Sequence, residues 1–167
     1  MFDPFKDFEQ AGYLRNRYGE KDLQIVQELE HQLFRAGLDQ AIAHLAKRRR
    51  LGYDDFLAVH RILFSAFYPW AGQDRAATAP DIAVTKAGTW FSHPADARRA
   101  VEEGLRIARD KRQFRQRSGE VMGLFAYGHP SWMAMGGRCW WCTANCATGL
   151  VSASNGIAPA RRITSKH

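Results

Sequence analysis

The chain has 167 residues, a formal net charge of +7 and a hydrophobic content of 46%. That length suits one domain, or one domain with a tail, and the apolar content suffices for a core. No apolar run approaches the roughly 20 residues that cross a membrane, and Met1–Lys6 lacks the basic and apolar regions of a signal peptide. These features exclude a membrane-spanning protein and predict folding in the cytoplasm, with signal-independent secretion left open.

Two basic clusters, Lys47–Arg50 and Arg106–Arg117, carry much of the positive charge. Cations suit the C-terminal end of a helix, so the first cluster is interpreted as a solvated helix end. The second cluster mixes with apolar residues at helical spacing, which indicates the wet face of a helix. A basic surface also suits phosphate-bearing partners, so a small nucleic-acid binder stays open as an alternative, although no DNA- or RNA-binding motif is present.

Apolar spacing and capping residues predict five helices and one extended flap. In chain order, Asp22 caps a first helix that runs to Gly37. Asp39 begins a second, and Asp54 begins a third that Pro69 ends. The third helix places apolar residues at spacings of three and four, together with a histidine: Phe56, Val59, His60, Leu63 and Phe67.

The second half of the chain begins with a change of pattern. Residues 73–93 alternate between apolar and small or polar side chains, which predicts a short β-hairpin flap. A helix over 94–112 then begins with a proline after Ser92 or His93, and the last helix begins near Ser118. The inward positions of the 94–112 helix are Ala97, Val101, Leu105 and Ala108. The predicted class is therefore all-α, with a small hairpin flap and an irregular C-terminal tail.

Two segments carry the functional signal. One is Tyr68-Pro69-Trp70-Ala71-Gly72, which is followed by Arg75, and the other is Leu124–Pro130, which presents His129. Alone, the first segment indicates a turn with an aromatic anchor and the second a helix end. A lone histidine is more often structural than catalytic.

Together, in this order and spacing, the two segments resemble the Fic (Fido) family of protein adenylyltransferases. The helical segment Phe56–Phe64 and the flap segment Val84–Phe91 also fit that family, and the resemblance covers roughly residues 1–130. It divides the chain into an N-terminal helical segment over 1–52, a Fic core over 53–138 and an atypical tail over 139–167, which we expect not to be natively folded.

The resemblance implies transfer of AMP from ATP to a Tyr, Thr or Ser hydroxyl of a target protein, with His129 as general base. It implies that ATP contacts five residues of the flap and the glycine-rich stretch: Lys86, Ala87, Gly136, Gly137 and Arg138. The target backbone would dock on the flap at Val84, Thr85 and Gly88. Magnesium is implied by the family, but its usual acidic ligand is absent, so no metal ligand is assigned.

After Pro130 the chain departs from the family motif H-P-F-x-D/E-G-N-G-R and continues as Ser131–Arg138. The phenylalanine, acidic residue, first glycine and asparagine are missing, and the arginine lies one residue late. A frameshift explains the difference. Codons for F-L-D-G-N-G-R-T, written TTC CTG GAT GGC AAT GGG CGG ACG, encode S-W-M-A-M-G-G when they are read one base later, and that is residues 131–137.

The tail contains all three cysteines, Cys139, Cys142 and Cys146. An odd count in one short segment argues against a disulfide scaffold. With His129 nearby, the spacing leaves a zinc site open. The frameshift supplies a simpler origin, because shifted leucine and valine codons yield cysteine and tryptophan.

Two hypotheses about the function follow. The first is an adenylyltransferase, which the altered motif would leave inactive in this chain if the anion-holding groups are essential. The second is a non-catalytic Fic remnant or protein-binding module, the product of a pseudogene. The resemblance also implies an inhibitory, antitoxin-like partner, because the inhibitory motif S/T-x-x-x-E-G/N is missing here: Met122 stands four positions after Ser118.

Overall fold

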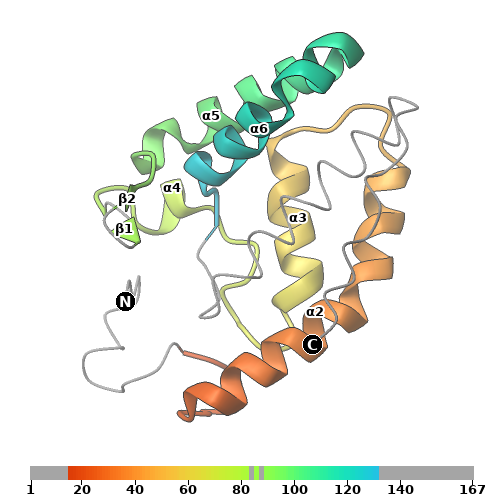
Figure 1. Ribbon diagram of the computed structural model, residues 1–167. Coiled ribbons are helices and arrows are strands. Elements are labelled where there is room, and N and C mark those ends of the chain that lie inside the picture. The colour runs from red at the N-terminus through yellow and green to blue at the C-terminus, as the bar shows by residue number, and fades with distance from the viewer. Residues whose placement is uncertain (1–14, 83–84, 87–88, 132–167) are drawn as a thin grey trace.

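The computed structural model describes residues 15–82, 85–86 and 89–131 (Figure 1). The elements follow in the order α2 (Leu23–Ala46), α3 (Tyr53–Phe64), α4 (Arg75–Thr78), β1 (Thr85–Lys86), β2 (Thr89–Trp90), α5 (Pro94–Arg109) and α6 (Lys111–Gly128). This order confirms the predicted helical class with a hairpin flap. No helix in the described part of the chain is long and apolar enough to span a membrane. The predicted tail over 139–167 lies outside the described residues.

Helix α2 is one continuous helix of 24 residues, so the prediction of two helices separated at Gly37 was wrong. Its start was predicted well, because the Asp22 carboxylate accepts from Gln24 N at 2.8 Å. At Gly37 an added Cβ would lie 3.3 Å from the Leu63 Cα. The glycine therefore lets α2 lie close against α3 instead of ending the helix.

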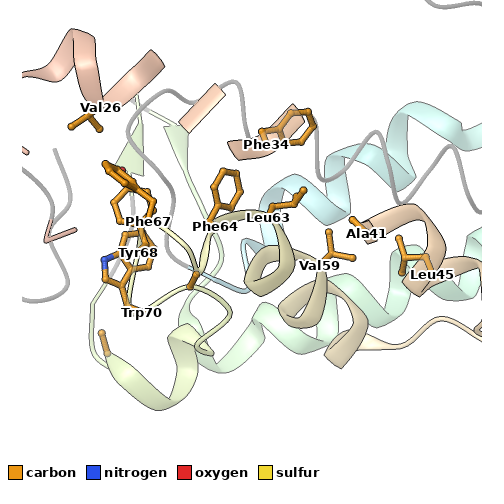
Figure 2. Packing of buried hydrophobic residues seen from close by; sticks show 12 residues of the cluster. Val26, Phe34, Ala41, Leu45, Val59, Leu63, Phe64, Phe67, Tyr68 and Trp70 are labelled. Atoms are coloured by element: carbon orange, nitrogen blue, oxygen red, sulfur yellow. The ribbon is translucent and has the colours of Figure 1, made fainter. Parts of the chain in front are cut away.

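The first hydrophobic cluster fills the space between α2, α3 and the turn that follows α3 (Figure 2). Its members are buried apolar side chains from these three segments, together with Ala79 at the end of α4: Val26, Phe34, Ala41, Leu45, Val59, Leu63, Phe64, Phe67, Tyr68, Trp70, Ala71 and Ala79. Helix α3 supplies the middle of the cluster, and its first turn belongs to a second cluster described below. Helix α3 is therefore the element on which both halves of the core rest.

Helix α5 agrees closely with its prediction. His93 is the N-cap, since its Nδ1 accepts from Ala95 N at 3.3 Å, and a proline occupies the first turn. The four predicted inward residues are all buried: Ala97, Val101, Leu105 and Ala108. The helix ends at Arg109, three residues earlier than expected, because Asp110 takes an extended conformation.

Helix α6 begins at Lys111, so the predicted start near Ser118 was wrong. Asp110 is its N-cap and accepts from Arg112 N at 2.8 Å. Inside the helix, Arg117 has φ −124° and ψ 25°, which breaks the regular helical geometry. The sequence signal at Ser118 therefore marks this kink and not the helix start.

The second hydrophobic cluster joins α3 to the α5–α6 pair, which lies beside it (Figure 1). The Phe56 and Phe125 rings meet edge to face, with centroids 4.9 Å apart. The buried members are Tyr53, Phe56, Val101, Leu105, Ile107, Ala108, Phe114, Val121 and Phe125. This packing sets the direction of α6 and hence the place where the chain leaves it.

Candidate active site

The turn that follows α3 is anchored by buried aromatic side chains. Tyr68 is 0% exposed and Trp70 is 1% exposed, and their ring centroids lie 4.5 Å apart (Figure 2). The Tyr68 hydroxyl donates to the Glu30 carboxylate on α2, and Trp70 Nε1 donates to Arg15 O at 2.9 Å. The tyrosine and tryptophan of this motif therefore hold the turn in place.

His60 joins the same turn to the segment after His129. Gly72 N donates to His60 Nδ1 at 2.9 Å, and Ser131 Oγ lies 3.3 Å from the same nitrogen. Gly72 has φ +76°, and a Cβ there would lie 2.6 Å from Arg61 Cβ, so a glycine is needed for this approach to α3. The sequence motifs did not predict that His60 belongs to the site. Its signal was a histidine on an otherwise apolar helix face.

His129, the predicted base, lies directly after α6 as its C-cap. Its backbone is left-handed, with φ 41° and ψ 62°, a conformation that costs a residue with a side chain about 1–2 kcal/mol. The residue is 2% exposed, and its imidazole centroid lies 4.9 Å from that of Phe91. Nearby, Ser92 N donates to Tyr127 O at 2.9 Å and joins the end of the flap to α6. The imidazole is therefore buried beside the segment that follows the flap.

Arg75, the last residue of the first motif, is 0% exposed and lies against the end of α6. Its Nε donates to His129 O at 3.0 Å, and its Nη2 donates to Ser92 O at 2.8 Å and to Gly128 O at 3.3 Å. Its backbone N donates to Pro130 O at 2.9 Å. Burial lowers the pKa of Arg75 from its ordinary value. One residue therefore bonds the end of the flap at Ser92 and, with its side chain and backbone together, the carbonyls of Gly128, His129 and Pro130.

The flap is a short antiparallel pair in which Thr85 lies opposite Trp90 and Lys86 opposite Thr89. Trp90 is 68% exposed, which is unusual for so large an apolar side chain. The backbone of Thr85 and Lys86 thus lies where a docking flap was predicted. The remaining predicted flap residues lie outside the described part of the chain: Val84, Ala87 and Gly88.

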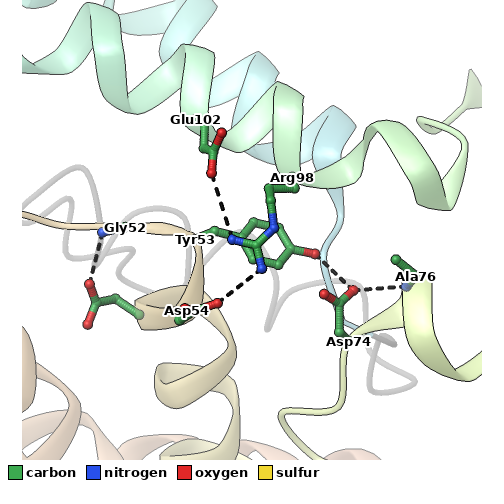
Figure 3. A network of polar contacts seen from close by, with 8 residues as sticks. Gly52, Tyr53, Asp54, Asp74, Ala76, Arg98 and Glu102 are labelled. Carbon is green, nitrogen blue, oxygen red and sulfur yellow. Dashed lines mark hydrogen bonds and ion pairs between the residues drawn. The ribbon is translucent and has the colours of Figure 1, made fainter.

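A polar network holds α4 in place (Figure 3). The Tyr53 hydroxyl donates to Asp74 Oδ1 at 2.9 Å, and the same oxygen accepts from Ala76 N at 2.8 Å, which caps α4. The Arg98 guanidinium carbon lies 4.1 Å from the centre of the Tyr53 ring, and Arg98 contacts Asp54 at 3.3 Å. Burial and the charge of Asp74 hold the pKa of Tyr53 well above 10. The network links α3, α4 and α5, and α4 carries the buried arginine.

The chain's residues do not fit the magnesium site that the resemblance implies. All 17 Asp and Glu residues lie at or before Glu120, so the stretch after Pro130 offers no carboxylate. Among residues 15–82, 85–86 and 89–131, no group of three His, Cys, Asp or Glu side chains could hold a metal ion. The nucleotide contacts predicted after Pro130 and the three cysteines lie outside the described residues: Gly136, Gly137, Arg138, Cys139, Cys142 and Cys146.

Solved structures share this fold. One is the crystal structure of BepC, a VirB-translocated effector protein from Bartonella tribocorum, with bound AMPPNP. Its TM-score is 0.65 at 15% identity, and the match covers 86% of this chain and 74% of that chain. Another is the N-terminal Fic domain of a Bartonella effector protein (Bep), a substrate of the VirB T4SS, from Bartonella sp. AR 15-3. Its TM-score is 0.64 at 15% identity, with 86% of this chain and 69% of that chain covered.

The sequence matches no protein-family model and no curated protein. At 15% identity, what the solved structures share with this chain is the fold. The chain has the fold of a Fic domain, which confirms the resemblance seen in its motifs.

Proposed function

We propose that this chain is a nucleotidyl-transfer domain that moves AMP from ATP to a Tyr, Thr or Ser hydroxyl of a target protein. The observation that carries the proposal is the placement of His129, which the first motif and the end of the flap hold at the end of α6 in a Fic-domain fold. The BepC structure, which shares this fold, contains AMPPNP, an adenine nucleotide. An adenine nucleotide is therefore the substrate class that we assign to this chain.

In the proposed reaction, His129 is the base. The target oxygen attacks the α-phosphorus of ATP, and a new P–O bond forms while the bond to the bridging oxygen breaks. Pyrophosphate leaves, and the hydroxyl proton passes to the imidazole. A histidine suits this role because its ordinary pKa of about 6.5 leaves the ring neutral, and able to accept a proton, at cellular pH.

The flap would dock the target. Its two short strands, which contain Thr85 and Lys86, leave a backbone edge to which an extended segment could add as another strand. Such pairing sets the register of the target and hence which hydroxyl is presented. Because the end of the flap is bonded to α6 at Tyr127, the docked segment would stay near His129.

A non-catalytic remnant that retains only this docking surface is the second candidate, and the composition after Pro130 favours it. The family motif places a glycine-rich backbone nest and an acidic residue there, and this chain has neither in the expected register. Loss of one donor that stabilises a developing anion slows a reaction by roughly 10²–10³-fold. Binding through the flap does not depend on those groups.

We propose that a one-base shift in the gene after the Pro130 codon produced the sequence that would make this chain a remnant. The restored frame would encode the full motif and return acidic residues to a tail that has none. Resequencing the gene across these codons tests the shift. A run of bases that cannot be translated into G-N-G-R in another frame would rule it out.

Labelled ATP distinguishes the two candidates. The purified full chain is incubated with candidate target proteins and with ATP labelled at the α-phosphate. We expect transfer of label that His129→Ala abolishes and that His31→Ala, at an exposed histidine on α2, retains. No transfer from this chain, together with transfer from a frame-restored chain, supports the remnant. Transfer from neither chain, or label that arrives only from the γ-phosphate, refutes AMP transfer.

A further inference from the structure

The buried guanidinium of Arg75 is bonded to backbone and hydroxyl oxygens. Besides its bonds to the His129, Ser92 and Gly128 carbonyls, its Nη2 lies 3.2 Å from Ser92 Oγ, which itself donates to Gly128 O at 3.1 Å. The carbonyls at the end of α6 carry the negative end of the helix dipole, so they suit a buried cation. The end of α6 is therefore a favourable place for this buried charge.

The hydrogen bonds from Arg75 are made at a residue, His129, whose backbone conformation is unfavourable. His129 is the one residue other than glycine with positive φ in the described part of the chain. A left-handed conformation at such a residue persists only when surrounding contacts over-determine it. Arg75 holds the carbonyl of His129 with its side chain and the carbonyl of Pro130 with its backbone N–H, so it fixes both peptide planes that follow the histidine Cα.

We propose that Arg75 is a positioning residue for His129: it holds the backbone of the histidine left-handed and thereby directs the imidazole toward Phe91. The contact that Arg75 would preserve is the one between the Phe91 and His129 rings, whose centroids lie 4.9 Å apart. The role of His129 as a base rests on the proposed function, but the placement of its ring does not. The two can therefore fail separately.

The test is the nuclear Overhauser cross-peak between the Phe91 and His129 rings in the full chain, with the His129 signal assigned from His129→Gln. We expect Arg75→Met to lower this cross-peak at least fivefold and to move the His129 ring resonances toward those of free histidine. The Phe56–Phe125 cross-peak, from rings also 4.9 Å apart, reports the fold and should persist. Arg106→Met is the control, because Arg106 is an exposed arginine that pairs with Glu103 on its own helix.

A full Phe91–His129 cross-peak in folded Arg75→Met would overturn the inference. If Arg75→Met loses both cross-peaks and is unfolded, Ser92→Ala decides, because it removes one hydroxyl that bonds both Arg75 and Gly128. In that folded variant we expect the Phe91–His129 cross-peak to fall at least twofold, and an unchanged intensity would equally overturn it. Since the readout is ring position, a chain that transfers no AMP still tests the role of Arg75.

Discussion

Gly72→Ala tests how tightly the turn after α3 is fitted against that helix. Gly72 has φ +76°, and Gly19 offers a matched position with φ +64°. An added Cβ at Gly72 would lie 2.6 Å from Arg61 Cβ and 2.7 Å from Leu57 O, whereas at Gly19 nothing lies within 4 Å. Both substitutions therefore strain the backbone, but only one of them also crowds its neighbours.

The difference between the two variants isolates the crowding. Left-handed backbone costs an alanine about 1–2 kcal/mol, which is the loss that we expect for Gly19→Ala. Overpacking adds about 1–3 kcal/mol, so Gly72→Ala should lose about 2–5 kcal/mol. The change in unfolded-chain entropy from glycine to alanine is common to both variants and cancels in the comparison.

The free energy of unfolding is measured in urea by circular dichroism, with tryptophan fluorescence as a second probe because Trp70 lies in the same turn. An unchanged dependence on urea concentration would show that the two variants unfold in the same way as the parent chain. Equal losses for Gly72→Ala and Gly19→Ala would refute the reasoning, because the steric contacts at Gly72 would then have no energetic consequence.

Tyr53→Phe removes the hydroxyl bonded to Asp74, and urea unfolding at neutral pH should show a loss of about 1 kcal/mol. Since the pKa of Tyr53 is raised, the unfolded chain loses this proton first as pH rises above 10. The stability of the parent chain should therefore fall there more steeply than that of Tyr53→Phe, and equal slopes would contradict the assignment. Gly123→Ala, with nothing within 4 Å of the added Cβ, should stabilise α6 by about 1 kcal/mol. Gly104→Ala places a Cβ 2.6 Å from the Phe125 ring and should lower the melting temperature, whereas Gly123→Ala should raise it. Calorimetry measures both, and melting temperatures that shift in the same direction in the two variants would contradict this packing.

The sequence was most informative where the signals were local and repeated. Helix α5 combines a proline in its first turn with apolar residues at spacings of three and four, and both its N-terminus and its buried face were predicted. The same holds for the Asp22 cap of α2. The domain boundaries proposed at residues 52 and 138 stay predictions.

The predictions were wrong where the same residue type is compatible with two different local structures. Gly37 resembles a helix end, but it serves contact with Leu63, a residue distant in the sequence. Asp110 ends one helix and caps the next, and a basic run on both sides of it hid the boundary. Such distinctions depend on which surfaces meet, and a single sequence does not contain that information.

The candidate site, too, was predicted only in part. His129 could be identified because two separated motifs agree in order and spacing. The role of Arg75 depends on the carbonyls of residues more than fifty positions away, and the role of His60 depends on Gly72 and Ser131. Both side chains were visible in the sequence, but their partners were not.

The single residue between α5 and α6 has a consequence for how the protein is made. Contacts between helices joined so closely require little loop-closure entropy, so we expect this hairpin to form among the first tertiary structures. Residues that emerge first from the ribosome can fold first, and everything up to Pro130 precedes the altered stretch. The described contacts around His129 come from residues up to Ser131, so this scaffold can begin to form as soon as these residues have left the ribosome.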